Sequence, residues 1–331
     1  MNHLRKIFRY SFPWARRNLI VYAPRLLRRL KLAFFRQHLS DGILTAGPFV
    51  GELGFEIGEW IPHIKSLADR YNCALHVFTR KGHEALYPFA EIVQTYDFPV
   101  ASSNCNWLFE PSEEEIDRYN KLENNMATYA AQPEFSRKFQ ILLKSGPKIR
   151  DKSFRSKVPV LIKANEDLLT KWKNELPPDP KVVLTYRANT RGSERNSSTE
   201  FVNQAANFVI KMGLTPIIIG KIDDKYPVPD FPGINLINKS TLEDVIAIYQ
   251  ISRVVMGSST GIIHLAASCG IPHITWGSTY KDDAIIERYK KDWNLNGTWV
   301  RFVSKEWNID FKDVESVLLE AIESSGYPEE K

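Results

Sequence analysis

The segment from Val254 to Ser278 constrains the fold of this chain more than any other. It reads V-V-M-G-S-S-T-G-I-I-H-L-A-A-S-C-G-I-P-H-I-T-W-G-S. Its apolar start predicts a strand buried on both faces, and residues 257–261 end that strand and open a helix. Gly270 ends the helix, Pro272 prevents its continuation, and a second strand begins at His273. The segment therefore predicts a strand–helix–strand unit of a parallel sheet.

The polar turn of this segment is a candidate phosphate site. Free amides and the dipole at a helix N-terminus attract anions, and a glycine lets a ligand approach the backbone. The candidate residues are Ser258, Ser259, Thr260 and Gly261, with His264 on the same helical face as Thr260. The alternative interpretation of His264 is a half-buried helix residue that bonds a neighbouring carbonyl.

The stretch S-S-T-G-I-I-H-L-A-A-S-C-G-I-P resembles the donor-binding segment of heptosyltransferase-like (family 9-like) glycosyltransferases, roughly D-S-G-x-x-H-L-A-A-A-x-G-x-P. One position departs, because the acidic residue usual before Ser-Gly is replaced here. The resemblance implies two Rossmann-like domains with parallel sheets that face each other across a cleft (GT-B). It also implies a nucleotide-diphosphate-sugar donor, inversion at the anomeric carbon, and a donor that His264 faces.

The order of the predicted elements divides the 331-residue chain into a leader and two α/β domains. Strands near 43–45, 74–79 and 92–96 start the first domain, and strands near 181–186, 216–219, 234–237, 254–256 and 273–276 form the second, with helices between them. A helix is predicted near 83–90, and 112–144 is predicted mostly helical. We expect a basic amphipathic leader over 1–41, an acceptor-side Rossmann-like domain over 42–176, a nucleotide-sugar-binding Rossmann-like domain over 181–305, and a C-terminal helix and tail over 306–331. The prolines at 177, 178 and 180 mark the boundary.

The leader differs in charge from the rest of the chain. Residues 1–40 hold ten of the 44 Lys and Arg residues and no Asp or Glu, so the remainder has 34 basic against 39 acidic residues. Nucleic-acid binding is therefore not expected of the body. From Arg25 to Arg36 the apolar side chains share one helical face, which is typical of a helix on an anionic membrane surface. An arm docked on the second domain, or a disordered tail, is the alternative.

The cellular location follows from the cysteines and the leader. Three scattered cysteines suit neither a disulfide framework nor a metal site. The longest uncharged run of the leader is far shorter than the ~20 residues that span a bilayer. We expect a cytoplasmic protein, peripheral on the inner face of a membrane.

A second candidate loop follows the strand that ends at Tyr186. It reads R-A-N-T-R-G-S-E-R-N and supplies Arg187, Arg191 and Arg195. Arginine binds phosphate through paired, charged hydrogen bonds, although a solvated loop with Arg paired to Glu194 is the alternative. Three further candidates for the nucleotide are Gly220, Thr241 and Leu242. No D-x-D motif stands in a suitable loop, so we expect the leaving diphosphate to be neutralised without a metal.

A glycine-punctuated stretch near the start of the first domain carries the candidate bases. It reads G-P-F-V-G-E-L-G-F-E-I-G-E-W-I-P, and its glycines predict an open loop. An inverting transfer needs a carboxylate that deprotonates the acceptor hydroxyl. Glu56 is the preferred candidate and Glu52 the other. Alternatively, these glutamates only favour the start of the following helix through its dipole.

Together these features predict a metal-independent, inverting glycosyltransferase. It would move a sugar from a nucleotide-diphosphate-sugar to a glycan or lipid-linked acceptor. A non-hydrolysing nucleotide-sugar epimerase of the same fold is the alternative enzyme, and it would need no acceptor. A nucleotide-sugar-binding protein without catalysis is the alternative from another class.

Overall fold

The computed structural model describes residues 42–97, 113–136, 140–144, 156–190, 192–278 and 283–324. The predicted leader over 1–41 and Arg191 lie outside these ranges. No helix of the described residues is long and apolar enough to cross a membrane.

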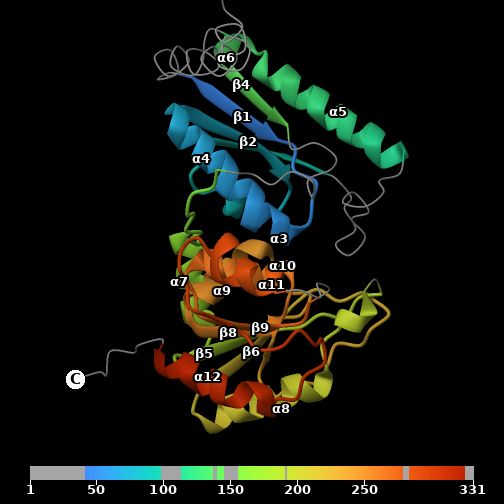
Figure 1. Ribbon diagram of the computed structural model, residues 1–331, viewed down its shortest axis with the longest axis vertical. Coiled ribbons are helices and arrows are strands. Elements are labelled where there is room, and N and C mark those ends of the chain that lie inside the picture. The colour runs from blue at the N-terminus through green and yellow to red at the C-terminus, as the bar shows by residue number, and fades with distance from the viewer. Residues whose placement is uncertain are drawn as a thin grey trace, which may run out of the picture.

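Two parallel sheets organise the chain (Figure 1). The first has the order β3-β2-β1-β4 and the second the order β10-β9-β8-β5-β6-β7. The strands are β1 (Ile43–Gly47), β2 (Ala74–Arg80), β3 (Ile92–Tyr96), β4 (Gln140–Lys144), β5 (Lys181–Thr185), β6 (Thr215–Ile219), β7 (Ile234–Asn235), β8 (Ser252–Ser258), β9 (His273–Trp276) and β10 (Val300–Phe302). All residues of β1 and of β5 are buried, as expected for central strands of parallel sheets.

Helices cover both faces of each sheet. The α-helices are α3 (Leu53–Phe55), α4 (Ile61–Tyr71), α5 (Glu113–Ala130), α6 (Pro133–Ser136), α7 (Glu166–Glu175), α8 (Thr199–Lys211), α9 (Leu242–Gln250), α10 (Gly261–Cys269), α11 (Ala284–Glu287) and α12 (Lys312–Ser324). The shorter 3-10 and π-helices are η1 (Glu56–Trp60), η2 (Glu84–Leu86), η5 (Ser193–Arg195) and η6 (Arg288–Asp292). In Figure 1, α9, α10 and α11 lie between the second sheet and the first half of the chain, and α8 and α12 lie beneath that sheet.

Strand alternation in β5 separates two hydrophobic cores. Val183 packs with α9, α10 and the first half of the chain, whereas Val182 and Leu184 pack with α8 and α12. Because the first of these cores runs from the first sheet to the second, the two halves of the chain share buried side chains.

Local signals in the sequence fix where the helices of the second half begin. Ser198 caps α8 by accepting from the amide of Phe201. Thr241 caps α9 in a capping box with Asp244, in which each side chain accepts from the other residue's amide. These caps satisfy amides that have no partner inside the helix.

Helix α7 packs on the second half of the chain. The Trp172 ring nitrogen donates to Asp244 at the start of α9, at 2.9 Å. The predicted boundary at the prolines 177, 178 and 180 would assign residues 166–175 to the first domain. We propose instead that the second unit begins before α7.

A tryptophan of the second half closes the junction between the halves. Trp293 follows η6 and packs over Gly58 of η1, where an added Cβ would lie 2.1 Å from the ring. Its ring nitrogen donates to Glu59 Oε1 at 2.7 Å, and its ring meets Phe55 edge-on. Lys157 bonds the same Glu59 oxygen and the Asp292 carbonyl. Both π-helices of the described residues therefore meet at this junction.

Candidate functional site

The two predicted phosphate-binding loops of the second half lie against each other. The loop after β5 and the turn after β8 leave neighbouring strands at the same, carboxyl edge of the sheet. Arg195 Nη2 donates to the Ser259 carbonyl at 3.2 Å, and the Arg195 guanidinium lies over the Trp307 ring at 5.0 Å. This contact joins residues 64 positions apart in the sequence. It places a cation beside the first residues of α10.

Arg187 lies next to Arg195 in the same loop. An added Cβ at Gly192 would be 3.3 Å from Arg195 Cδ and 3.4 Å from Arg187 Nη2. Arg187 Nη1 donates to the Gly192 carbonyl and to Asn196 Oδ1, both at 2.7 Å. Burial and then the charge of Arg195 lower the pKa of Arg187, although nearby Glu194 opposes this. Two guanidinium groups held this close favour an anion between or beside them.

Two buried polar atoms at this position have no hydrogen-bond partner in the described part of the chain. They are Arg195 Nε and Thr260 Oγ1. Thr260 is the N-cap of α10, but its hydroxyl caps no amide. A buried donor or acceptor without a partner costs about 1–3 kcal/mol, so a ligand that bonds both groups would recover this loss.

Ser259 is bonded through both its amide and its hydroxyl. The Ser259 amide donates to the Trp276 carbonyl at 2.7 Å, and its hydroxyl accepts from the Tyr289 hydroxyl at 2.9 Å. Ser258 is buried at the end of β8. Of the Ser259 and Thr260 hydroxyls, only that of Thr260 is buried without a partner among the described residues.

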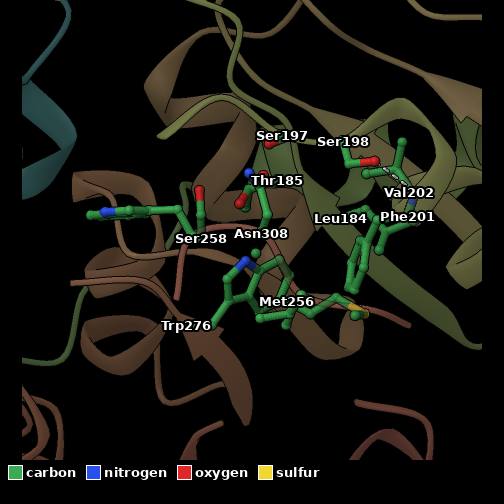
Figure 2. A pocket seen from close by; sticks show the side chains of 13 residues that line it. Leu184, Thr185, Ser197, Ser198, Phe201, Val202, Met256, Ser258, Trp276 and Asn308 are labelled. Atoms are coloured by element: carbon green, nitrogen blue, oxygen red, sulfur yellow. Dashed lines mark hydrogen bonds between the residues drawn. The ribbon is translucent and has the colours of Figure 1, made fainter. Parts of the chain in front are cut away.

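A small cavity lies next to these loops (Figure 2). Its volume is about 20 Å³, which is room for about one water molecule. Polar and aromatic side chains from the carboxyl ends of the strands line it: Thr185, Ser197, Ser198, Ser258, Trp276, Trp307 and Asn308. A nucleotide does not fit this cavity.

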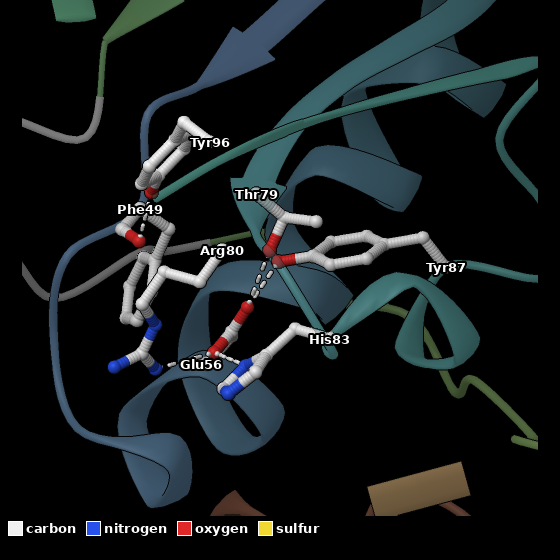
Figure 3. Close-up of polar contacts among 7 residues, drawn as sticks. All are labelled: Phe49, Glu56, Thr79, Arg80, His83, Tyr87 and Tyr96. Atoms are coloured by element: carbon white, nitrogen blue, oxygen red, sulfur yellow. Dashed lines mark hydrogen bonds and ion pairs between the residues drawn. The ribbon is translucent and has the colours of Figure 1, made fainter. Parts of the chain in front are cut away.

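Glu56 has a quite different setting from the one predicted. The chain becomes helical at Leu53, so Glu56 lies in η1 and not in an open loop. Its carboxylate is fully buried and accepts four hydrogen bonds (Figure 3). The donors are Thr79 Oγ1 at 3.1 Å and Tyr87 hydroxyl at 2.6 Å on Oε1, and Arg80 Nη2 at 3.1 Å and His83 Nδ1 at 2.7 Å on Oε2.

This setting argues against Glu56 as the catalytic base. Burial raises the pKa of Glu56, but the charges and hydrogen bonds of His83, Arg80 and Tyr87 outweigh it and bring the pKa to about 2. A carboxylate with that pKa is a weak base at neutral pH, and all of its lone-pair directions are used. Glu52 precedes it by one helical turn, is exposed, and makes no capping hydrogen bond through its side chain.

Comparison with solved structures identifies the architecture. E. coli ADP-heptose LPS heptosyltransferase II matches with a TM-score of 0.57 and 12% identity over 86% of this chain and 99% of that one. The chain has the GT-B fold. A glycosyl transferase of family 9 from Veillonella parvula matches with a TM-score of 0.57 and 12% identity, over 87% of this chain and 98% of that one.

A third match was solved with a nucleotide-sugar. The dodecameric iron-containing heptosyltransferase TibC of E. coli, in complex with ADP-D-β-D-heptose, matches with a TM-score of 0.50 and 14% identity, over 87% of this chain and 78% of that one. No protein-family model and no curated protein sequence matches the chain. At identities this low, the structural matches establish the GT-B fold and not the reaction.

Within this GT-B fold, His264 is a packing residue. Its ring stacks on Tyr289 with centroids 4.3 Å apart, meets the Trp293 ring edge-on at 4.5 Å, and is 6% exposed. Burial, together with His273 and Arg288, lowers the pKa of His264 well below its usual value, so the ring is neutral at pH 7. The prediction that it faces the donor is not supported by this enclosed position.

Two of the predicted site glycines, Gly261 and Gly220, allow close packing of the protein backbone. An added Cβ at Gly261 would lie 2.8 Å from the Gly54 amide nitrogen and 2.9 Å from Leu53 Cβ, so the first half of the chain covers this residue. Gly220, a predicted nucleotide contact, instead lets its strand pass the Tyr186 carbonyl, at 2.0 Å from an added Cβ. The sequence predicted that Gly261 would let a ligand approach the backbone and that Gly220 would contact the nucleotide.

The other predicted nucleotide contacts have local roles. Thr241 exchanges hydrogen bonds with Asp244 in the capping box, and Leu242 packs against the core that joins the two halves. That Thr241 and Leu242 contact the nucleotide therefore stays a prediction.

The sequence analysis missed the cations beside Glu56 and the aromatic residues beside His264. Arg80 and His83 follow the predicted strand at 74–79 in the run R-K-G-H, so polar residues at a strand's carboxyl end were an available signal. Tyr289 lies in η6 and Trp293 directly after it, in a region for which no element was predicted. Nothing in the local pattern indicated that they would pack on α10.

Proposed function

We propose that the chain is a glycosyltransferase that binds a nucleotide-diphosphate-sugar at the carboxyl edge of its second sheet. The donor's diphosphate would lie between the Arg187–Arg195 loop and the start of α10. Arg187 and Arg195 would bond it through their guanidinium groups, beside the N-cap residue Thr260. The first half of the chain would hold a glycan or lipid-linked acceptor.

One observation carries this proposal: the hydrogen bond from Arg195 to the Ser259 carbonyl, which brings both predicted loops to one place. It supplies a charged fork and a helix N-terminus for the same anion. The GT-B fold and the nucleotide-sugar bound to TibC are consistent with a donor of this class. Binding by residues 1–40 to an anionic membrane surface remains part of the proposal.

The choice of catalytic base depends on which of the two glutamate side chains is exposed. We propose Glu52 as the base, because its exposed carboxylate can reach an acceptor hydroxyl and the Glu56 carboxylate cannot. The guanidinium groups would stabilise the charge that develops on the leaving diphosphate. We propose that the transfer is inverting and uses no metal.

Arg195→Gln should weaken binding of a nucleoside diphosphate about tenfold or more, because a charge-assisted hydrogen bond contributes about 1.5–3 kcal/mol. Isothermal titration with ADP, UDP and GDP would measure this. Arg301→Gln is the matched control, since Arg301 also bonds a single acceptor, Glu320, but lies on the surface. Equal affinities of both variants for every diphosphate would refute the donor site.

A further inference from the structure

A pair of basic side chains stands at the carboxyl end of β2, in the first half of the chain. Arg80 is the last residue of this strand, and His83 follows it in a tight turn closed by the His83 amide and the Arg80 carbonyl at 3.0 Å. Gly82, the third residue of the turn, has a φ of +85°, a conformation that favours glycine. The turn brings both side chains to the same oxygen of Glu56.

Glu56 holds Arg80 and His83 in place, but it accepts from only one nitrogen of each side chain. Arg80 contributes only its Nη2 to the carboxylate, and its Nε is buried with no partner among the described residues. His83 bonds Glu56 through Nδ1, which leaves Nε2 on the other side of the ring. The two side chains remain 13% and 19% exposed, so a small solute can reach them.

The second oxygen of the Glu56 carboxylate, Oε1, also accepts two hydrogen bonds. Thr79 and Tyr87 donate to Oε1, away from Arg80 and His83 (Figure 3). Four donors therefore hold one buried anion, and the described residues supply no second anion for the other guanidinium donors of Arg80. A preorganised guanidinium with free donors is the usual way in which a protein recognises a carboxylate or a phosphate.

We propose that Arg80 and His83 form a binding site for an oxyanion, either a phosphate or a carboxylate group. Arg80 donates from its second terminal nitrogen, and the His83 ring lies beside it on the same Glu56 oxygen. Glu56 is a positioning residue that orients both. Glu52 precedes Glu56 by one helical turn, and its carbonyl accepts from the Glu56 amide at 3.0 Å.

We further assign this oxyanion to the acceptor, and that assignment rests on the proposed function. The donor's diphosphate belongs to the second sheet, whereas Arg80 ends a strand of the first. An anionic group at Arg80 would place the acceptor next to the exposed carboxylate of Glu52. Binding of the oxyanion itself does not depend on the reaction.

The test uses the full-length chain and the side-chain nitrogen signals of its seven histidines. Inorganic phosphate and acetate are titrated separately at constant ionic strength, and the His83 signal is identified by its loss in His83→Gln. We expect a saturable shift of the His83 signal. Arg80→Lys keeps a cation beside Glu56 and removes the fork, so it should weaken binding about tenfold or more. Arg301→Lys, the surface control, should not change it.

The outcomes separate this site from the donor site. A His83 shift that disappears in Arg80→Lys and persists in Arg195→Gln supports the proposal. Absence of a saturable shift, or equal affinity in Arg80→Lys and the wild type, overturns it. If Arg195→Gln leaves diphosphate binding unchanged while Arg80→Lys abolishes the His83 shift, the proposed donor site fails and the oxyanion site stands. The relative response to phosphate and acetate identifies which group the site prefers.

Discussion

Replacing Glu56 by glutamine is expected to lower the free energy of unfolding by about 3 kcal/mol at pH 7. The side chain is completely buried, and its pKa falls from 4.5 to about 2 in the folded protein. Four donors converge on the carboxylate. An amide nitrogen in place of one oxygen would face two of these donors and leave the Arg80 charge without its counter-ion.

The same group gives the variant a distinct pH dependence. Because the folded pKa lies below the unfolded one, the stabilisation by Glu56 is fully present above about pH 4.5 and is lost as the pH falls towards 2. The stability difference between wild type and Glu56→Gln should therefore shrink over this range. Urea unfolding followed by tryptophan fluorescence at several pH values measures it.

Glu52→Gln is the matched control for this experiment. Glu52 is a glutamate one helical turn earlier, but it is exposed, and its side chain makes no capping hydrogen bond. Its replacement should change the free energy of unfolding by no more than about 0.5 kcal/mol. If both variants unfold at the same urea concentration, the buried network around Glu56 does not exist as described.

The spacing of apolar residues and the positions of turn residues were sufficient to predict most strands and helices. The apolar runs that became β1, β5 and β8 are short, buried and followed by turn residues, so their patterns contain the whole signal. The predicted second sheet follows from such runs, whereas the GT-B architecture was implied by the family resemblance of the segment around His264.

Where the predicted secondary structure was wrong, contacts with distant parts of the chain determine the structure. Residues 140–144 form β4 beside β1 and not a helix, because sheet pairing overrides a weak local preference. Only Glu84–Leu86 of the predicted helix at 83–90 is helical, as a 3-10 turn. The glycines of the first domain predicted an open loop, yet Gly54 and Gly58 lie in helical turns that pack against the second half.

The same limit applies to the candidate site. The sequence indicated Arg195 and the start of α10, which the structure brings together, since both follow strands of one sheet. It could not indicate that Glu56 would be enclosed by donors from β2 and the turn after it, or that Tyr289 and Trp293 would enclose His264. Such contacts depend on packing between distant segments, for which one sequence contains no local pattern.

Trp293→Ala is expected to lower the free energy of unfolding by about 3–5 kcal/mol, as for other buried tryptophans. The ring is 6% exposed, packs on Gly58 and His264, and donates to Glu59. Its removal leaves a cavity at the junction of the two halves and takes away one of the two donors to Glu59 Oε1. Equilibrium urea unfolding measures the loss, and a value below about 1 kcal/mol would contradict this packing.

Gly58→Ala tests the same contact from the opposite side. In the wild type its new methyl group would lie 2.1 Å from the Trp293 ring, so we expect a loss of about 1–3 kcal/mol from overpacking. In the Trp293→Ala background the methyl group has room, and the higher helical propensity of alanine should make the substitution stabilising by up to about 1 kcal/mol.

Gly54→Ala is the control: its methyl group would lie 3.3 Å from the Trp293 ring, so it should cost less than Gly58→Ala. A change of sign between the two backgrounds, measured as a double-mutant cycle, would show that Trp293 closes the junction by packing on Gly58. Equal effects in both backgrounds would show that the ring lies elsewhere.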